Sequence, residues 1–174
     1  RRSPQHRAQD AFVPHESGPG REFLLGLRQT RDFGPVVTLA AGGVHAEFLS
    51  RALVPGQATA IFCPELDHED VIDAALDRLA AARLAIEPQR GHRPILYRSE
   101  LVGAVRRLLA FARTPQAEAL SEFEVNPLVV SDGRLVALDA LAKLAGWRER
   151  LPAPRPIRRI ATLLEPRTIA VMGV

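Results

Sequence analysis

The chain of 174 residues is 47% hydrophobic and 25% charged, which is the composition of an ordinary globular protein. A net charge of only +3, with scattered basic residues and 5% aromatic residues, argues against nucleic-acid binding. No apolar run is long enough to span a membrane, and the single cysteine, Cys63, excludes an internal disulfide and fits a cytoplasmic protein.

The first third of the chain predicts a sheet. β-Branched residues flanked by glycine and proline favour strands at residues 11–14, 21–30, 33–43 and 59–62. Residues 44–49 fit either another strand or a short helix, and the pattern alone does not choose between them.

Two amphipathic helices are predicted next, on one face of the sheet. Over residues 67–85, Asp67 is the expected N-cap and acidic residues occupy the first turn. The apolar face of that helix comprises Val71, Ile72, Ala75, Leu76 and Leu79. The second helix begins at Ser99 and ends before Pro115, where a helix cannot easily continue.

The stretch EFEVNPLVVSDGRLVALDA, residues 122–140, predicts a hairpin with Asp132 and Gly133 at its turn. Antiparallel pairing then places Asn126 opposite Asp139, with Cβ atoms about 5 Å apart. The alternation of a strand puts Glu122 and Glu124 on the same face. Oxygens converging from opposed strands suit Mg²⁺, which nucleotide phosphates and waters complete. The alternative is a solvated face on which Asn126–Pro127 only bends the strand.

The C-terminal residues predict a change of domain. Residues 148–156 are rich in proline and arginine and read as a linker. A short helix is expected over residues 157–166, and a strand entering a glycine turn over residues 167–174. We expect the chain to be part of a longer polypeptide of the α+β class, with a mixed sheet.

Three stretches resemble one family. EVNPLVVSDGRLVALDA resembles the metal-binding end of the ATP-grasp domain in nucleoside-diphosphate-forming acyl-CoA synthetases, the relatives of acetate–CoA ligase and succinyl-CoA synthetase. REFLLGLRQTRDFGPVVTLAAGGVHAEFL resembles the family's E-x-x-x-G, F-G-P-V and G-G-x-x-x-E motifs, and RRIATLLEPRTIAVMGV resembles the entry into its CoA-binding domain. The resemblance implies the C-terminal part of an ATP-grasp domain at residues 1–147, then the linker, then the start of a Rossmann-like domain at 157–174.

The resemblance also implies chemistry. A complete protein of this family converts a small carboxylic acid, CoA and ATP to acyl-CoA, ADP and phosphate, and this fragment alone is expected to be inactive. Asn126 and Asp139 would bind Mg²⁺, beside Glu124. Backbone at Gly42 and Gly43 could approach the nucleotide closely, and Glu47 belongs to the same motif. No catalytic residue is assigned, and assembly into a homo-oligomer is left open.

Two other functions compete with a ligase. Some protein acetyltransferases carry a similar synthetase-like region that senses a ligand and regulates the acetyltransferase domain. A third reading is a degenerate lobe of purely structural value. Loss of metal binding despite the presence of Asn126 and Asp139 would favour that last reading.

Overall fold

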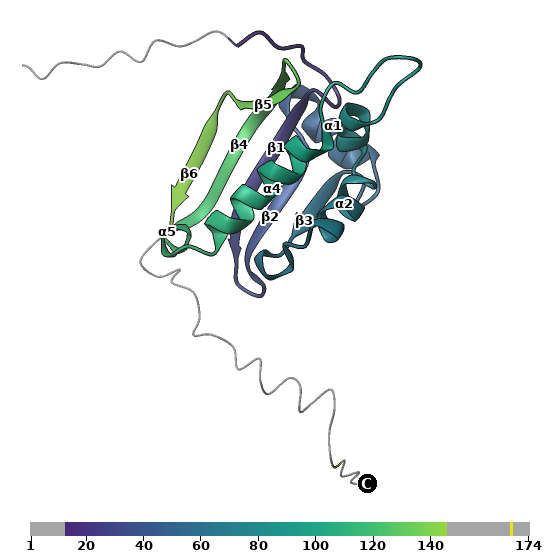
Figure 1. Cartoon of the computed structure of the whole chain (residues 1–174). Coiled ribbons are helices and arrows are strands. Elements are labelled where there is room, and N and C mark those ends of the chain that lie inside the picture. The colour runs from purple at the N-terminus through teal and green to yellow at the C-terminus, as the bar shows by residue number, and fades with distance from the viewer. Residues whose placement is uncertain (1–12, 146–167, 169–174) are drawn as a thin grey trace, which may run out of the picture.

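The computed structural model describes residues 13–145 and Thr168 (Figure 1). Its centre is a sheet with strand order β3-β2-β1-β4-β5, in which β6 also pairs with β4. The strands are β1 (Glu22–Thr30), β2 (Gly34–Ala41), β3 (Thr59–Phe62), β4 (Leu120–Ser131), β5 (Arg134–Ala137) and β6 (Ala140–Leu144). In this described part every strand pairing is antiparallel, so the expectation of a mixed sheet is wrong. Hairpins join β1 to β2 and β4 to β5, and such turns can connect only antiparallel strands.

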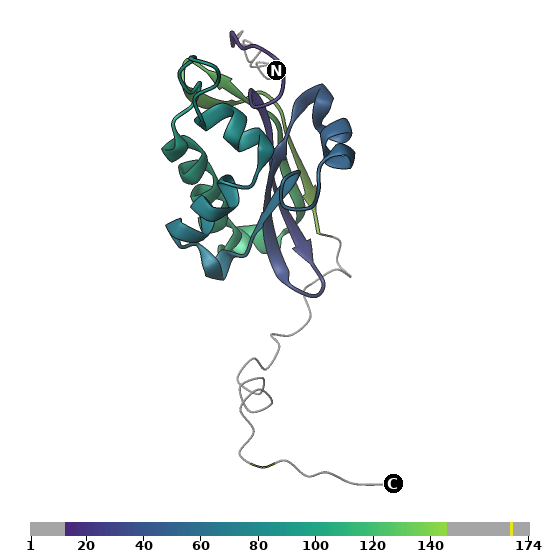
Figure 2. The same ribbon diagram turned by 90° about the vertical axis from the view of Figure 1, so that its right-hand side faces the viewer.

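Helices cover the sheet unequally. Figure 2 shows α1 on one face of the sheet and the helices between β3 and β4 on the other. The helices are η1 (Gly43–His45), α1 (Ala46–Ala52), η2 (Pro64–Leu66), α2 (Glu69–Leu76), α3 (Ala80–Ile86), α4 (Arg98–Ala112) and α5 (Pro115–Glu118). The α+β class is therefore confirmed. None of the helices in the described residues is long and apolar enough to cross a membrane.

The hydrophobic core lies between the sheet and α4. Phe23 and Leu27 of β1 are fully buried, as is Leu101 on the facing side of α4. Phe123 and Val125 of β4 also pack against this core. Because side chains alternate along a strand, Glu122, Glu124 and Asn126 are left on the opposite face of the sheet, the face that carries α1.

Most predicted elements are confirmed within a few residues, and two are corrected. Residues 44–49, whose pattern fits either strand or helix, form helix. Residues 13–17 have no regular structure, so the strand at 11–14 is wrong where it is described. The single helix expected at 67–85 is two helices, α2 and α3. Asp67 does not cap the first of them, because its carboxylate pairs with Arg113 at 2.9 Å and the N-cap residue is His68.

The break between α2 and α3 has a tertiary cause. Leu79 is fully buried in an extended conformation (ψ 113°), and the next residue, Ala80, donates its N–H to the carbonyl of Gln57 at 3.0 Å. Packing and this bond replace the continuous helix that local propensity favours. The predicted linker at 148–156 and the C-terminal elements lie outside the described residues, apart from Thr168.

Candidate functional site

The hairpin has the predicted turn and register. Asp132 and Gly133 both have positive φ, 48° and 73°, and Ser131 pairs with Arg134. The pairing continues beyond the end of β5 into β6, where Val125 pairs with Ala140. Between these two ladders the N–H of Asn126 donates to the carbonyl of Asp139 at 3.1 Å. Asn126 and Asp139 are therefore directly opposed, as the sequence predicts.

A bulge in the neighbouring ladder changes the strand at this point. On β1, Phe23 pairs with Leu128 but Leu25 pairs with Val125. On β1 one residue, Leu24, separates Phe23 from Leu25. On β4 two residues, Asn126 and Pro127, separate Val125 from Leu128, and a cis peptide bond joins them. A bulge of this kind interrupts the ladder and redirects side chains, and bulges are common beside active sites. The only indication of the bulge in the sequence is Pro127.

The side chain of Asn126 is held at both ends. Its Oδ1 accepts a hydrogen bond from the N–H of Gly43 at 3.2 Å, and its Nδ2 donates to Glu124 Oε1 at 3.2 Å. An amide group can satisfy both partners only in this orientation, since Gly43 offers a donor and Glu124 an acceptor. Oδ1 retains a second lone pair. Asn126, Glu124 and Gly43, three of the predicted site residues, are thus brought together.

The turn formed by Gly42 and Gly43 is packed too closely for side chains. Gly43 has φ 67°, and a Cβ atom there would lie 2.5 Å from the carboxyl carbon of Glu22. A Cβ atom at Gly42 would lie 2.9 Å from the backbone nitrogen of Leu24. The N–H of Gly42 donates to the carbonyl of Glu22 at 2.9 Å. Glycine at both positions is therefore required by the approach of the Gly42–Gly43 turn to β1.

Glu22, the glutamate of the E-x-x-x-G motif, lies beside the site, although the sequence did not assign it a role. Its side chain is only 6% exposed, and Oε2 accepts a hydrogen bond from the N–H of Gly18 at 3.1 Å. It is the one charged residue among the buried residues of the described chain. Its signals in the sequence are its place in the E-x-x-x-G motif and its position at the start of a strand whose neighbours are apolar.

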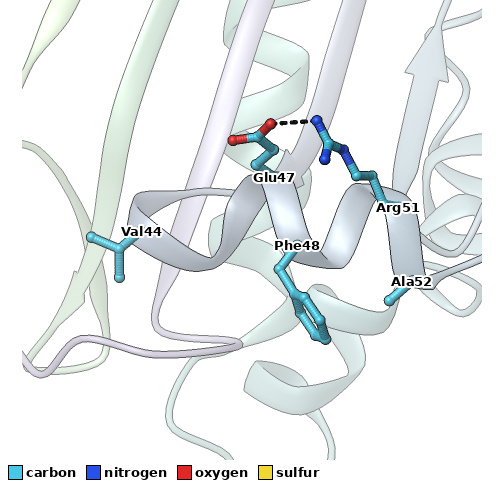
Figure 3. A pocket seen from close by; sticks show the side chains of 5 residues that line it. All are labelled: Val44, Glu47, Phe48, Arg51 and Ala52. Carbon is cyan, nitrogen blue, oxygen red and sulfur yellow. Dashed lines mark hydrogen bonds and ion pairs between the residues drawn. The ribbon is translucent and has the colours of Figure 1, made fainter.

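Two further acidic residues stand apart from this group. Glu47, on α1, pairs with Arg51 at 2.6 Å rather than with the hairpin (Figure 3). It lines an open hollow of about 540 Å³ together with Val44, Phe48, Arg51 and Ala52. Glu122 pairs with Lys143 on β6 at 2.6 Å, and the hydrogen bond from Lys143 is the main reason that the pKa of Glu122 is lowered.

The donor set fits a magnesium ion better than a transition metal. Within residues 13–145 and Thr168, no three His, Cys, Asp or Glu side chains are grouped so that they could hold a metal. The hairpin offers the amide oxygen of Asn126 and the exposed carboxylate of Asp139, whose Oδ1 accepts the N–H of Ala140 at 2.8 Å. Mg²⁺ commonly binds few protein oxygens and takes its remaining ligands from phosphates and water.

A family model described as an ATP-grasp domain matches residues 1–144. The chain belongs to the ATP-grasp family. No curated protein matches it.

This ATP-grasp chain is similar in fold to several solved structures. One is the dinucleotide-forming acetyl-coenzyme A synthetase 1 of Candidatus Korarchaeum cryptofilum in complex with coenzyme A and Mg-AMPPCP, with 22% identity, a TM-score of 0.59, and coverage of 74% of this chain and 55% of that chain. Another is PH1788 of Pyrococcus horikoshii, with 17% identity, a TM-score of 0.55, and coverage of 75% and 51%. The ATP-grasp chain thus spans about half the length of these proteins.

Proposed function

We propose that this chain is the nucleotide-binding part of a nucleoside-diphosphate-forming acyl-CoA synthetase, which converts a carboxylic acid, CoA and ATP to acyl-CoA, ADP and phosphate. One observation carries the proposal: Asn126 lies opposite Asp139, and its amide oxygen is held by the glycine turn. The ATP-grasp match and the fold shared with an acetyl-CoA synthetase support it.

In this proposal each site residue has a role. Asn126 Oδ1 and the Asp139 carboxylate would hold Mg²⁺, and the ion would offset negative charge on the nucleotide phosphates. Glu124 fixes the amide of Asn126 by accepting its Nδ2–H. Glycine at positions 42 and 43 lets the turn pack against β1, and the backbone of the turn would face the nucleotide. Glu47, on the neighbouring helix, would contribute only after leaving Arg51.

The test is an acid- and CoA-dependent release of ADP and phosphate by the complete polypeptide, measured over a panel of small carboxylic acids. Asp139→Asn should abolish turnover, whereas Asp132→Asn, at the exposed tip of the same hairpin, should leave it unchanged. Equal turnover in Asp139→Asn and the unaltered protein would overturn the metal assignment. Nucleotide binding without turnover for any acid would instead favour the regulatory function.

A further inference from the structure

We propose that Glu22 is a positioning residue that sets the Gly42–Gly43 turn and thereby aims Asn126 at the metal. The inference rests on the proposed function and extends it to a residue that is outside the predicted ligand set. Glu22 is the first residue of β1 and pairs with Val129 of β4, directly beside the bulge that contains Asn126.

The carboxyl group of Glu22 is buried, which is unusual for a charged side chain. A polar group removed from water costs free energy unless it is hydrogen-bonded. Here the N–H of Gly18 donates to Oε2 at 3.1 Å, so the carboxyl group is held from the loop that precedes β1. With 6% exposure, Glu22 is poorly placed to bind a ligand itself.

The neighbour of the carboxyl group is Gly43. The space that a Cβ atom at Gly43 would need is filled by Oε1, Oε2 and Cδ of Glu22, the last at 2.5 Å from that position. The turn also donates the N–H of Gly42 to the backbone carbonyl of Glu22 at 2.9 Å. The main chain of Glu22 thus fixes one end of the turn and its side chain supports the other. Truncating the side chain would leave a void beneath Gly43 while keeping the bond at Gly42.

A shift of the Gly42–Gly43 turn would affect Asn126, the proposed metal ligand, through one hydrogen bond. The N–H of Gly43 donates to Asn126 Oδ1 at 3.2 Å and so helps to choose which end of the amide is the oxygen. Movement of the unsupported turn would release that oxygen, leaving only the bond from Nδ2 to Glu124. Groups that orient metal ligands in this way typically change metal affinity by about 10–100-fold when they are removed.

The experiment is a double-mutant cycle on the complete polypeptide, with the affinity for ADP measured with Mg²⁺ and with chelator. Glu22→Ala should weaken Mg²⁺-dependent ADP binding by about tenfold or more and leave the Mg²⁺-independent affinity unchanged. When Asn126→Ala is already present, Glu22→Ala should have no further effect on the ADP affinity. Glu22→Gln, which keeps an acceptor for Gly18, should restore most of the affinity. Glu118→Ala, an exposed glutamate on α5, is the control expected to match the unaltered protein. If Glu22→Ala does not fold, Glu22→Asp takes its place.

Hydrogen exchange separates this inference from the proposed function. Glu22→Ala should speed exchange of the Gly43 amide by roughly tenfold in nucleotide-free protein, because the unsupported turn no longer holds this N–H against Asn126 Oδ1. Unchanged exchange and unchanged Mg-ADP affinity, or losses from Glu22→Ala and Asn126→Ala that simply add, would overturn the positioning role. Unaltered protein that binds ADP without any metal dependence would overturn the proposed function, and the link from Glu22 to a metal with it.

Discussion

Gly43 and Asn126, 83 positions apart in the sequence, are joined by a hydrogen bond from the Gly43 N–H to the Asn126 Oδ1. The bond connects the turn that follows β2 to β4, the first strand of the C-terminal hairpin. It is short-range in space and long-range in sequence, so it forms only when the antiparallel sheet has assembled. The proposed metal site of the hairpin would therefore be completed by tertiary structure and would not be a local feature of one motif.

Substituting Gly43 should damage the site more than the positive φ alone explains. Gly43→Ala would place a methyl group against the Glu22 carboxyl group, whereas Gly56→Ala, also at positive φ (86°), has nothing within 4 Å of its Cβ position. Both substitutions should cost roughly 1–2 kcal/mol of backbone strain. Only Gly43→Ala should also weaken Mg-ADP binding, by about tenfold or more. Calorimetric titration and chemical denaturation of both variants make the comparison, and equal affinities would contradict the tight fit of the turn.

The packing of α4 on the sheet predicts a large stability loss. Leu101 is fully buried between this helix and the strands, so Leu101→Ala should lower the free energy of unfolding by about 2–5 kcal/mol. Leu84→Ala, on α3 with 42% of its side chain exposed, should cost less than about 1 kcal/mol. Urea denaturation measures both. A smaller loss for Leu101→Ala than for Leu84→Ala would mean that α4 does not lie on the core.

The ion pair between Glu122 and Lys143 predicts a pH dependence of small size, because the pair is partly exposed. The hydrogen bond from Lys143 lowers the pKa of Glu122 from its ordinary value of 4.5. Its contribution to stability is therefore complete above that value and disappears as the pH falls through the lowered pKa of the folded state. The difference in unfolding free energy between the unaltered protein and Lys143→Met should shrink as the pH falls below about 4.5. A difference that stays constant or grows on acidification would contradict the pairing of β4 with β6.

The hairpin register could be predicted because its determinants are local. A two-residue Asp-Gly turn fixes the pairing, and from it the facing of Asn126 and Asp139 follows by counting. The same holds for β3, whose bounds, Thr59–Phe62, coincide with the prediction. Here the pattern of apolar residues and the turn chemistry lead to the same result.

The remaining features depend on contacts between distant segments. The division of residues 67–85 into α2 and α3 depends on the bond from Ala80 to Gln57, and Arg113 removes Asp67 from its expected place as a cap. The bulge at Asn126 appears only in the pairing with β1. Glu22 could not be assigned to the site because its burial results from the glycine turn, which is 20 residues further along the chain.

The most direct test of the metal half-site is titration of ADP into the complete polypeptide, in Mg²⁺ and in chelator. ADP should bind more tightly in Mg²⁺ than in chelator. This difference should be lost in Asp139→Asn and kept in Asp132→Asn. An unchanged Mg²⁺ advantage in Asp139→Asn would contradict the metal role of the hairpin.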